Sequence, residues 1–264
     1  MTASPPGRRR FHEYQDLMRH RIMDILLVST PYDTFILEEA GELSERMLGE
    51  FRNLDLHYAP GLTGISTGTE ALRVARENSR VNLIITTPHL EDMDAAELAR
   101  RSKADGLDVP VVLLAWDTRE LSDFQARRDT SAIERTFLWQ GDARMLVSIV
   151  KSVEDWRNAE HDTGAVGVQV IILVEDNVRY YSSFLPVMYT ELLHHSQRVI
   201  VEGLNLSQKI LRMRARPKIL LCTTWEEAER AFERYADEVL GIISDVEFPR
   251  AGEKVPRAGA AVAR

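Results

Sequence analysis

The chain has 264 residues, of which 44% are hydrophobic and 28% are charged, and this composition is typical of a globular protein with room for two ordinary domains. Its formal net charge of −8 does not favour binding along a nucleic-acid backbone, and no apolar run reaches the length of a membrane span. The single cysteine, Cys222, excludes an intramolecular disulfide framework and fits a reducing cytoplasm.

Two parts of the chain resemble each other. The apolar run ILLVST (25–30) matches IILVED (171–176), and each is typical of a strand that is buried on both faces of a parallel sheet. Further along, the segments 67–77 and 223–233 each begin with a Thr-x-x-Glu capping box, which predicts the start of a helix. The order strand, long helical region, strand, helix, strand therefore occurs twice in the chain.

Each of these helices leads to another apolar strand, VNLIIT (81–86) in the first copy and LGIIS (240–244) in the second. Only the first copy continues, with strands predicted at 109–115 and 135–139 and a helix at 142–158. Because strands that alternate with helices form parallel sheets, the sequence predicts an α/β fold.

The domain boundaries follow from this repeat. We expect a disordered or helical lead-in at 1–19, a five-stranded domain at 20–158 and a linker at 159–167. A second domain at 168–250 would be C-terminally incomplete, and 251–264 has the composition of a disordered tail.

The second domain contains a long helical segment at 178–216. It has room for two helices, with a break near Pro186 or Gly203. The basic stretch RMRARPK (212–218) is expected to be a solvated helix end.

The strand at 240–244 would lie at an open edge of the incomplete sheet. An unpaired apolar edge favours aggregation or strand exchange. We expect the first domain, the helical segment or a second chain in a homodimer to cover it.

Carboxylates gather at the ends of two strands in the second domain. Glu175 and Asp176 end the first strand, and Asp245 ends the third, so they should meet at the carboxyl edge of a parallel sheet. Like charges so close repel each other unless a cation joins them. Mg²⁺ fits because it binds carboxylate and phosphate oxygens, and a carboxylate beside it is suited to accept a phosphoryl group. The alternatives are an acidic helix cap for the pair and a turn residue for Asp245.

The segments ILVEDN and GIISDVEFPRAG resemble the receiver domain of two-component response regulators, which has a flavodoxin-like fold of five strands. The resemblance implies two flavodoxin-like receiver domains in this chain. It implies that Glu175 and Asp176 hold Mg²⁺, and that a histidine kinase or phosphotransfer protein phosphorylates Asp245. It also implies that Asp245 and the backbone carbonyl of Glu247 complete the metal site.

The first copy departs from this family pattern. Ser29 and Thr30 stand at the positions of the acidic pair, and Thr87 stands at the acceptor position. Ala115 and Gln140 stand where the family has a hydroxyl residue and a lysine. The resemblance implies a receiver that has lost its chemistry and serves packing, dimerisation or contact with a partner.

Residues 11–250 also resemble the N-terminal regulatory part of large bacterial proteins that join receivers to a phosphoenolpyruvate/pyruvate-binding, dikinase-like module. The phrases FLWQGDARMLVSIVKSVEDWRNAEHDT and VEDNVRYYSSFLPVMYTELL carry this resemblance. The sequence contains no ATP-grasp segment and no phosphohistidine domain, so the activity of that module is not assigned to this chain.

The main hypothesis is a cytoplasmic phosphorelay receiver module, which is a phosphoacceptor regulatory protein rather than an enzyme with turnover. Two alternatives stay open. One is a phosphate-independent interaction or dimerisation scaffold. The other is the severed regulatory front end of a phosphotransferase that binds phosphoenolpyruvate or pyruvate.

Overall fold

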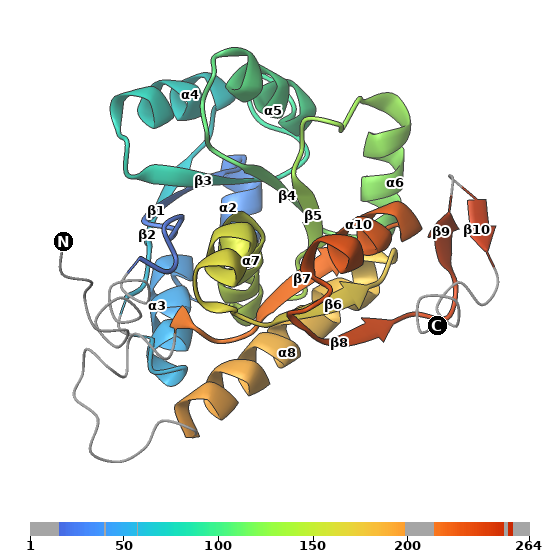
Figure 1. Cartoon of the computed structure of the whole chain (residues 1–264). Helices are drawn as coiled ribbons and strands as arrows, with labels where there is room; N and C mark the ends of the chain where they lie inside the picture. Colours follow the sequence, from blue (N-terminus) through green and yellow to red (C-terminus); the bar gives the residue numbers. More distant parts are fainter. Residues whose placement is uncertain (1–15, 40, 57, 199–213, 251–252, 256–264) are drawn as a thin grey trace. The chain divides into compact units, whose positions relative to one another are not determined.

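The computed structural model describes residues 16–39, 41–56, 58–198, 214–250 and 253–255. It divides into two compact units, each of which is described by itself (Figure 1). The first unit is Ile22–Val150, and the second unit is Met1–Arg21 together with Lys151–Arg264. No helix among the described residues has the length and hydropathy needed to cross a membrane.

The first unit is an α/β domain. In chain order it contains β1 (Asp24–Val28), α2 (Pro31–Leu37), α3 (Leu43–Asn53), β2 (Gly61–Ile65), α4 (Gly68–Glu77), β3 (Val81–Thr86), α5 (Ala95–Ala104), β4 (Val111–Ala115), α6 (Thr118–Arg127), β5 (Arg135–Leu138) and the first residues of α7 (Arg144–Val166). The strands are parallel and lie in the order β2-β1-β3-β4-β5. This is the flavodoxin-like order. The predicted fold class is therefore confirmed.

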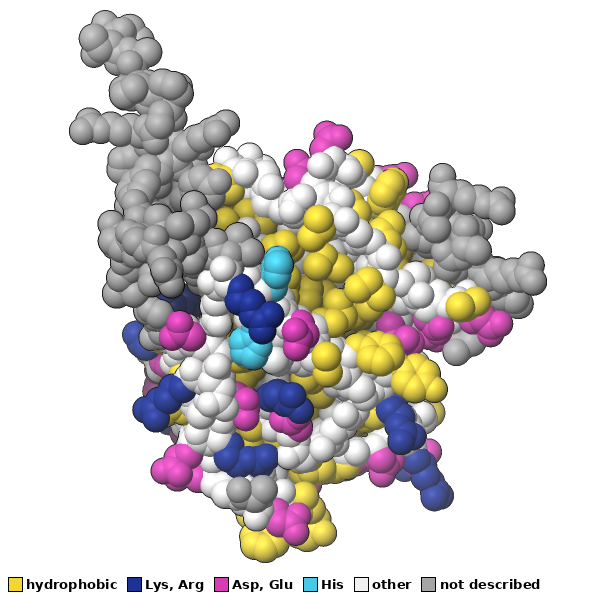
Figure 2. All heavy atoms as spheres, turned by 90° about the horizontal axis from the view of Figure 1, so that it is seen from below, with side chains coloured by type: hydrophobic (Ala, Val, Ile, Leu, Met, Phe, Trp, Pro, Cys, Tyr) yellow, Lys and Arg dark blue, Asp and Glu magenta, His cyan; other side chains and the backbone are white. Residues whose placement is uncertain are grey.

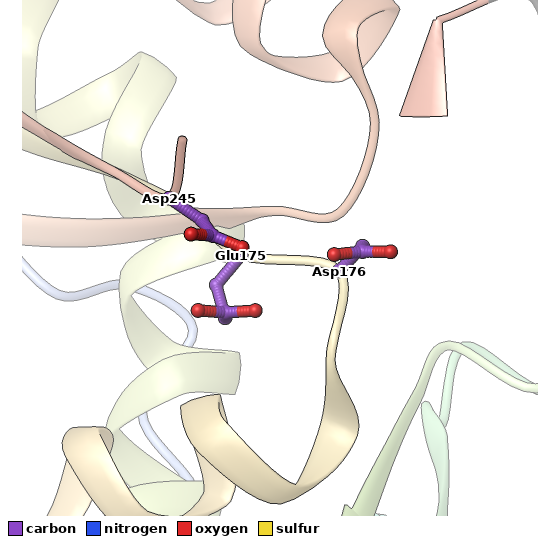
Figure 3. A group of neighbouring side chains, drawn as sticks. All are labelled: Glu175, Asp176 and Asp245. Atoms are coloured by element: carbon purple, nitrogen blue, oxygen red, sulfur yellow. The ribbon is translucent and has the colours of Figure 1, made fainter. Parts of the chain in front are cut away.

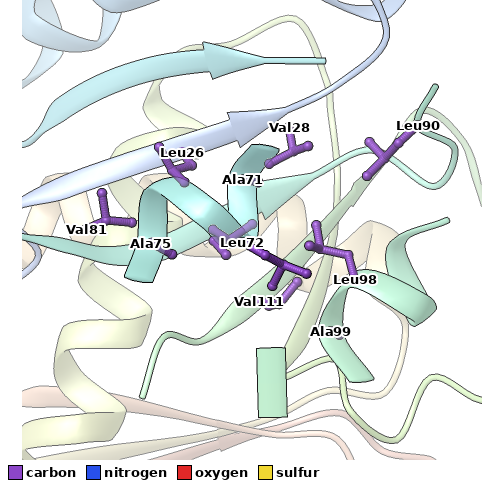
Figure 4. Close-up of a cluster of buried hydrophobic side chains, with 11 residues drawn as sticks. Leu26, Val28, Ala71, Leu72, Ala75, Val81, Leu90, Leu98, Ala99 and Val111 are labelled. Atoms are coloured by element: carbon purple, nitrogen blue, oxygen red, sulfur yellow. The ribbon is translucent and has the colours of Figure 1, made fainter. Parts of the chain in front are cut away.

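The core of the first unit follows from alternation along its buried strands. Leu26 and Val28 of β1 face one side, where they pack with residues of α4 and α5 such as Leu72 and Leu98 (Figure 4). The intervening Leu27 is also buried, and Figure 1 shows α3 and the start of α7 over that other face. Burial on both faces explains why these strands read as unbroken apolar runs.

The second unit repeats the first part of this plan. Its elements are the rest of α7, β6 (Val170–Val174), α8 (Val178–Arg198), β7 (Lys218–Cys222), α10 (Trp225–Tyr235), β8 (Val239–Ser244), β9 (Phe248–Arg250) and β10 (Glu253–Val255). Its parallel sheet has the order β7-β6-β8, which corresponds to β2-β1-β3. The pairing of β1 with β3 shifts its register after Asp24, and the corresponding pairing of β6 with β8 shifts its register after Val170.

The two capping boxes start helices as predicted. The side chain of Thr67 accepts a hydrogen bond from the backbone N–H of Glu70, and Thr224 accepts one from Glu227. Each threonine satisfies a donor that the first turn of its helix leaves without an intrahelical partner.

Of the two positions predicted for a break, Pro186 is excluded, because α8 continues through this residue. Tyr181, Leu185 and Tyr189 recur every four residues and are buried, so packing of this face stabilises the helix in spite of the proline. Gly203, the other predicted position for a break, lies outside the described residues.

The segment 159–167 is not a linker, because α7 extends to Val166. Ala159 and Asp162 are fully buried, which makes this stretch part of the second unit's core. The helix ends at Gly167, whose φ of 69° is in the left-handed region and whose N–H donates to the carbonyl of Thr163 at 2.8 Å.

Two cations of the basic stretch that was expected to be solvated are buried in the described part, residues 214–218. Arg216 is 4% exposed and Lys218 is 0% exposed. Two carboxylates of α7, Asp155 and Asp162, bind these cations, at 2.7 Å from Arg216 Nη2 to Asp155 Oδ1 and at 2.9 Å from Lys218 Nζ to Asp162 Oδ2. Composition alone did not reveal these partners, because Asp155 precedes Arg216 by 61 residues and Asp162 is likewise far from Lys218 in the sequence.

The two ends of the chain also differ from expectation where they are described. Glu253–Val255 lie in the stretch that was expected to be a disordered tail, but they form β10, which pairs antiparallel with β9. In the lead-in, Leu17 is buried and belongs to the second unit. Residues 1–15 and 256–264 lie outside the described residues.

Candidate functional site

The site is built at the carboxyl ends of two neighbouring strands. In the β6·β8 pair, Val174 is opposite Ser244, and the next residues along each strand are Glu175 and Asp245. The N–H of Asp245 donates to the carbonyl of Val174 at 2.9 Å. The two carboxylates therefore start from adjacent points of the sheet, as the sequence predicted.

Asp176 joins this pair from the loop between β6 and α8. One carboxylate oxygen from each of Glu175, Asp176 and Asp245 lies within 4.8 Å of the others. Figure 3 shows the three side chains, two from the loop after β6 and one from the end of β8. We call these three residues the acidic cluster.

Backbone contacts hold Glu175 in place. Its side chain is buried, its Oε1 accepts a hydrogen bond from the N–H of Asn177 at 3.0 Å, and its own N–H donates to the carbonyl of Cys222 at 3.0 Å. The side chain of Asn177 in turn accepts from the N–H of Arg179. This is the contact of a helix N-cap, so Asn177 rather than the acidic pair caps α8.

Asp245 is more accessible, because its side chain is partly exposed. Its Oδ1 accepts a hydrogen bond from the N–H of Val246 at 2.6 Å, and the hydroxyl of Ser244 donates to its carbonyl at 2.7 Å. The contact with Val246 orients the carboxylate, and solvent reaches Asp245 because the residue is partly exposed.

The donor set of the cluster suits a hard divalent cation. It offers carboxylate oxygens and neither a thiolate nor an imidazole, and such oxygen donors are preferred by Mg²⁺. Three carboxylates this close also repel one another, and a bound cation removes that repulsion. The residues present therefore fit Mg²⁺. Glu247 is exposed, and the role of its backbone carbonyl stays a prediction.

The corresponding edge of the first unit has no such cluster among its described residues. Ser29 is buried and shares a 2.8 Å hydrogen bond with Thr34, while Thr30 caps α2 by accepting from the N–H of Asp33 at 3.1 Å. Ala115 is fully buried and Gln140 is exposed.

At the acceptor position of the first unit, Thr87 donates from its hydroxyl to Oδ2 of Asp33 at 2.9 Å. The indole N–H of Trp116 donates to Oδ1 of the same carboxylate at 3.1 Å. Both oxygens of Asp33 are therefore engaged, and the ends of β3 and β4 are tied to α2. Sequence reasoning missed Asp33, although its place three residues after the cap Thr30 was visible.

No protein-family model and no curated protein matches the chain. Among solved structures, the chain is similar to the signal receiver domain of an HD domain-containing protein from Pseudomonas fluorescens Pf-5. The identity is 22% and the TM-score is 0.36, over 54% of this chain and 93% of that one. At this distance no residue role carries over, and the fold assignment rests on the strand order of the sheets.

Proposed function

We propose that the second unit is a receiver-like phosphoacceptor module in which Asp245 takes up a phosphoryl group and Glu175 and Asp176 hold Mg²⁺. One observation carries this proposal, which is that the three carboxylates converge within 4.8 Å at the ends of adjacent parallel strands. The phosphodonor would be a histidine kinase or a phosphotransfer protein. A link to a dikinase-like module rests on sequence resemblance alone.

The roles of the three carboxylates follow from their surroundings. An oxygen of Asp245 forms the new bond to phosphorus, while the bond from phosphorus to the donor's leaving group breaks and its electron pair departs with that group. Partial exposure suits Asp245 to this role. Glu175 is buried and accepts a hydrogen bond from the N–H of Asn177, so it is suited to bind a cation on the buried side of the site. Bound Mg²⁺ would neutralise charge on the phosphoryl oxygens.

For the first unit we propose a phosphate-independent role as an interaction scaffold. The acceptor position holds Thr87 rather than an aspartate, and both oxygens of the nearby Asp33 carboxylate already accept hydrogen bonds from Thr87 and Trp116. On α2, Tyr32 and Phe35 are each 72% exposed and lie one turn apart, which suits contact with another protein.

A titration with Mg²⁺ and beryllofluoride, a phosphoryl mimic, tests the proposal for the second unit. The ring of Trp225 stacks on that of Phe248, which lies three residues after Asp245 in the sequence. Tryptophan fluorescence should therefore report occupancy of the site. We expect a saturable change that needs both components and disappears in Asp245→Asn. The matched control is Asp237→Asn, which removes an exposed acid of the same unit. Identical curves for the wild type and Asp245→Asn would refute the proposal.

A further inference from the structure

One edge of the second unit's sheet, along β8, has no neighbouring strand among the described residues. Within the described residues, β8 pairs with β6 on one side, and no strand is hydrogen-bonded to its other side. The exposed side chains along β8 are apolar, since Leu240 is 51% exposed and Ile243 is 50% exposed. Figure 1 shows α10 over one face of this sheet and α8 over the other.

The apolar surface continues from this edge onto α8. Tyr180, Phe184 and Val187 recur at helical spacing, and each is about half exposed. The rings of Tyr180 and Phe184 stack with centroids 6.2 Å apart. Figure 2, seen from below, shows hydrophobic side chains gathered in a band on this face. A band of this kind marks an interaction site.

The first unit shows what covers the equivalent edge. Ile243 pairs with Leu173 as Ile85 pairs with Leu27, so Ile85 is its counterpart. Ile85 is fully buried, and the next strand, β4, runs parallel along that edge. Among the described residues, corresponding strands therefore occur once with and once without a neighbour on this edge.

The register of the covered edge indicates which strand would fit beside β8. Ile84, Ile85 and Thr86 of β3 are opposite Val111, Val112 and Leu113 of β4. The N–H of Ile84 donates across this edge to the carbonyl of Pro110 at 3.0 Å. The counterpart of Ile84 is Ile242, and its N–H should point to the open side of β8. The fitting partner is an apolar strand that runs parallel to β8.

Charges at the two ends of β8 select among such strands. Asp237 and Glu238 precede the strand, Asp245 and Glu247 follow it, and no charged residue lies between. A second copy related by a two-fold axis would pair antiparallel and place acids opposite acids, which is destabilising. A strand with a basic residue at each end would instead meet an opposite charge at each end.

We propose that β8 and the apolar stripe of α8 form a docking surface for a partner polypeptide, which adds a parallel apolar strand with basic residues at both ends. Backbone hydrogen bonds would supply affinity, and the side chains packed beside Ile243 and the flanking charges would supply specificity. This surface adjoins the acidic cluster, because Asp245 is both a member of that cluster and one of the flanking charges.

The test uses the full chain and a fluorescently labelled peptide, Lys-Val-Val-Leu-Leu-Ala-Lys, whose centre copies Val111–Ala115. The control peptide has glutamate in place of both lysines. Binding is measured by fluorescence anisotropy in EDTA, so that no metal offsets the acidic residues. We expect the lysine peptide to bind at least tenfold more tightly than the glutamate peptide, and its binding to weaken with salt.

Two protein variants locate the binding surface. Ile243→Arg should weaken binding at least tenfold, whereas Leu48→Arg, at an exposed apolar position of α3 in the first unit, should leave it unchanged. Hydrogen exchange of the Ile242 amide should slow when the peptide binds. The absence of binding, equal binding of the two peptides, or full binding by Ile243→Arg would each overturn the proposal. Self-association that Ile243→Arg abolishes would also overturn it, because the partner would then be a second copy.

Discussion

Arg216 and Asp155 form a bidentate ion pair that is almost excluded from solvent. Arg216 Nη2 donates to Oδ1 at 2.7 Å and Nη1 donates to Oδ2 at 2.9 Å, and the side chains are 3% and 0% exposed. Asp155 also accepts from the hydroxyl of Tyr189 at 3.1 Å and from the N–H of Ile219 at 2.9 Å. This carboxylate therefore joins α7, α8 and the start of β7 in the second unit.

Removing one member of this pair should strongly destabilise the second unit. We predict that Arg216→Met lowers the free energy of unfolding by about 3–5 kcal/mol, because Asp155 keeps its buried charge without a counter-ion. Urea denaturation followed by circular dichroism measures the loss. Arg234→Met is the matched control, since Arg234 pairs with Glu160 on the surface, and it should change stability little. Equal effects of the two variants would contradict the assignment.

Tyr189 should make the second unit sensitive to alkali. Burial raises the pKa of Tyr189 well above its ordinary value, and the neighbouring Asp155 carboxylate adds to the shift. The unfolded chain therefore releases this proton before the folded chain does, and stability falls as the pH rises above about 10. We predict a shallower decline in Tyr189→Phe, measured as the urea midpoint against pH. A decline of unchanged slope would show that another group causes it.

In the first unit, the contact between Thr87 and Asp33 should contribute to stability. Thr87→Val removes one hydrogen bond to a partly buried carboxylate and should cost about 1–2 kcal/mol. Thr87→Ser keeps the hydroxyl and is the control for this loss, although it also removes a methyl group. Thermal unfolding of the two variants measures the difference. A serine variant as unstable as the valine variant would assign the effect to packing rather than to the hydrogen bond.

The acidic cluster should bind Mg²⁺ through all three carboxylates. We predict that Glu175→Gln and Asp176→Asn each weaken Mg²⁺ binding at least tenfold, because each removes a charged oxygen donor. Isothermal calorimetry measures the affinity. Asp237→Asn should bind as the wild type does, and an equal loss in that control would indicate a general effect of charge.

Much of the fold and of the acidic cluster was visible in the sequence because local rules govern them. The apolar runs predicted β1 and β6, the capping boxes at Thr67 and Thr224 started their helices, and the carboxylates stood at strand ends. Parallel topology then brings such ends together, so the proximity of Glu175 and Asp245 needed no knowledge of distant contacts.

The features that sequence reasoning missed depend on contacts between distant residues. The burial of Lys218 needs Asp162 from another element, and the role of Asp33 needs Thr87 and Trp116. Pro186 is a helix breaker by local propensity, but the buried side chains of Leu185 and Tyr189 outweigh that preference. Local patterns do not specify which distant residue will supply a counter-charge or a packing surface.

The most direct test of the phosphoacceptor assignment is covalent labelling. The intact chain is incubated with acetyl phosphate and Mg²⁺, and its mass is measured before and after removal of the donor. We predict the gain of one phosphoryl group that hydroxylamine removes, that EDTA prevents, and that Asp237→Asn retains. Loss of the label in Asp245→Asn would support Asp245 as the acceptor. A wild-type chain that gains no label, or an Asp245→Asn variant labelled as fully as the wild type, would contradict it.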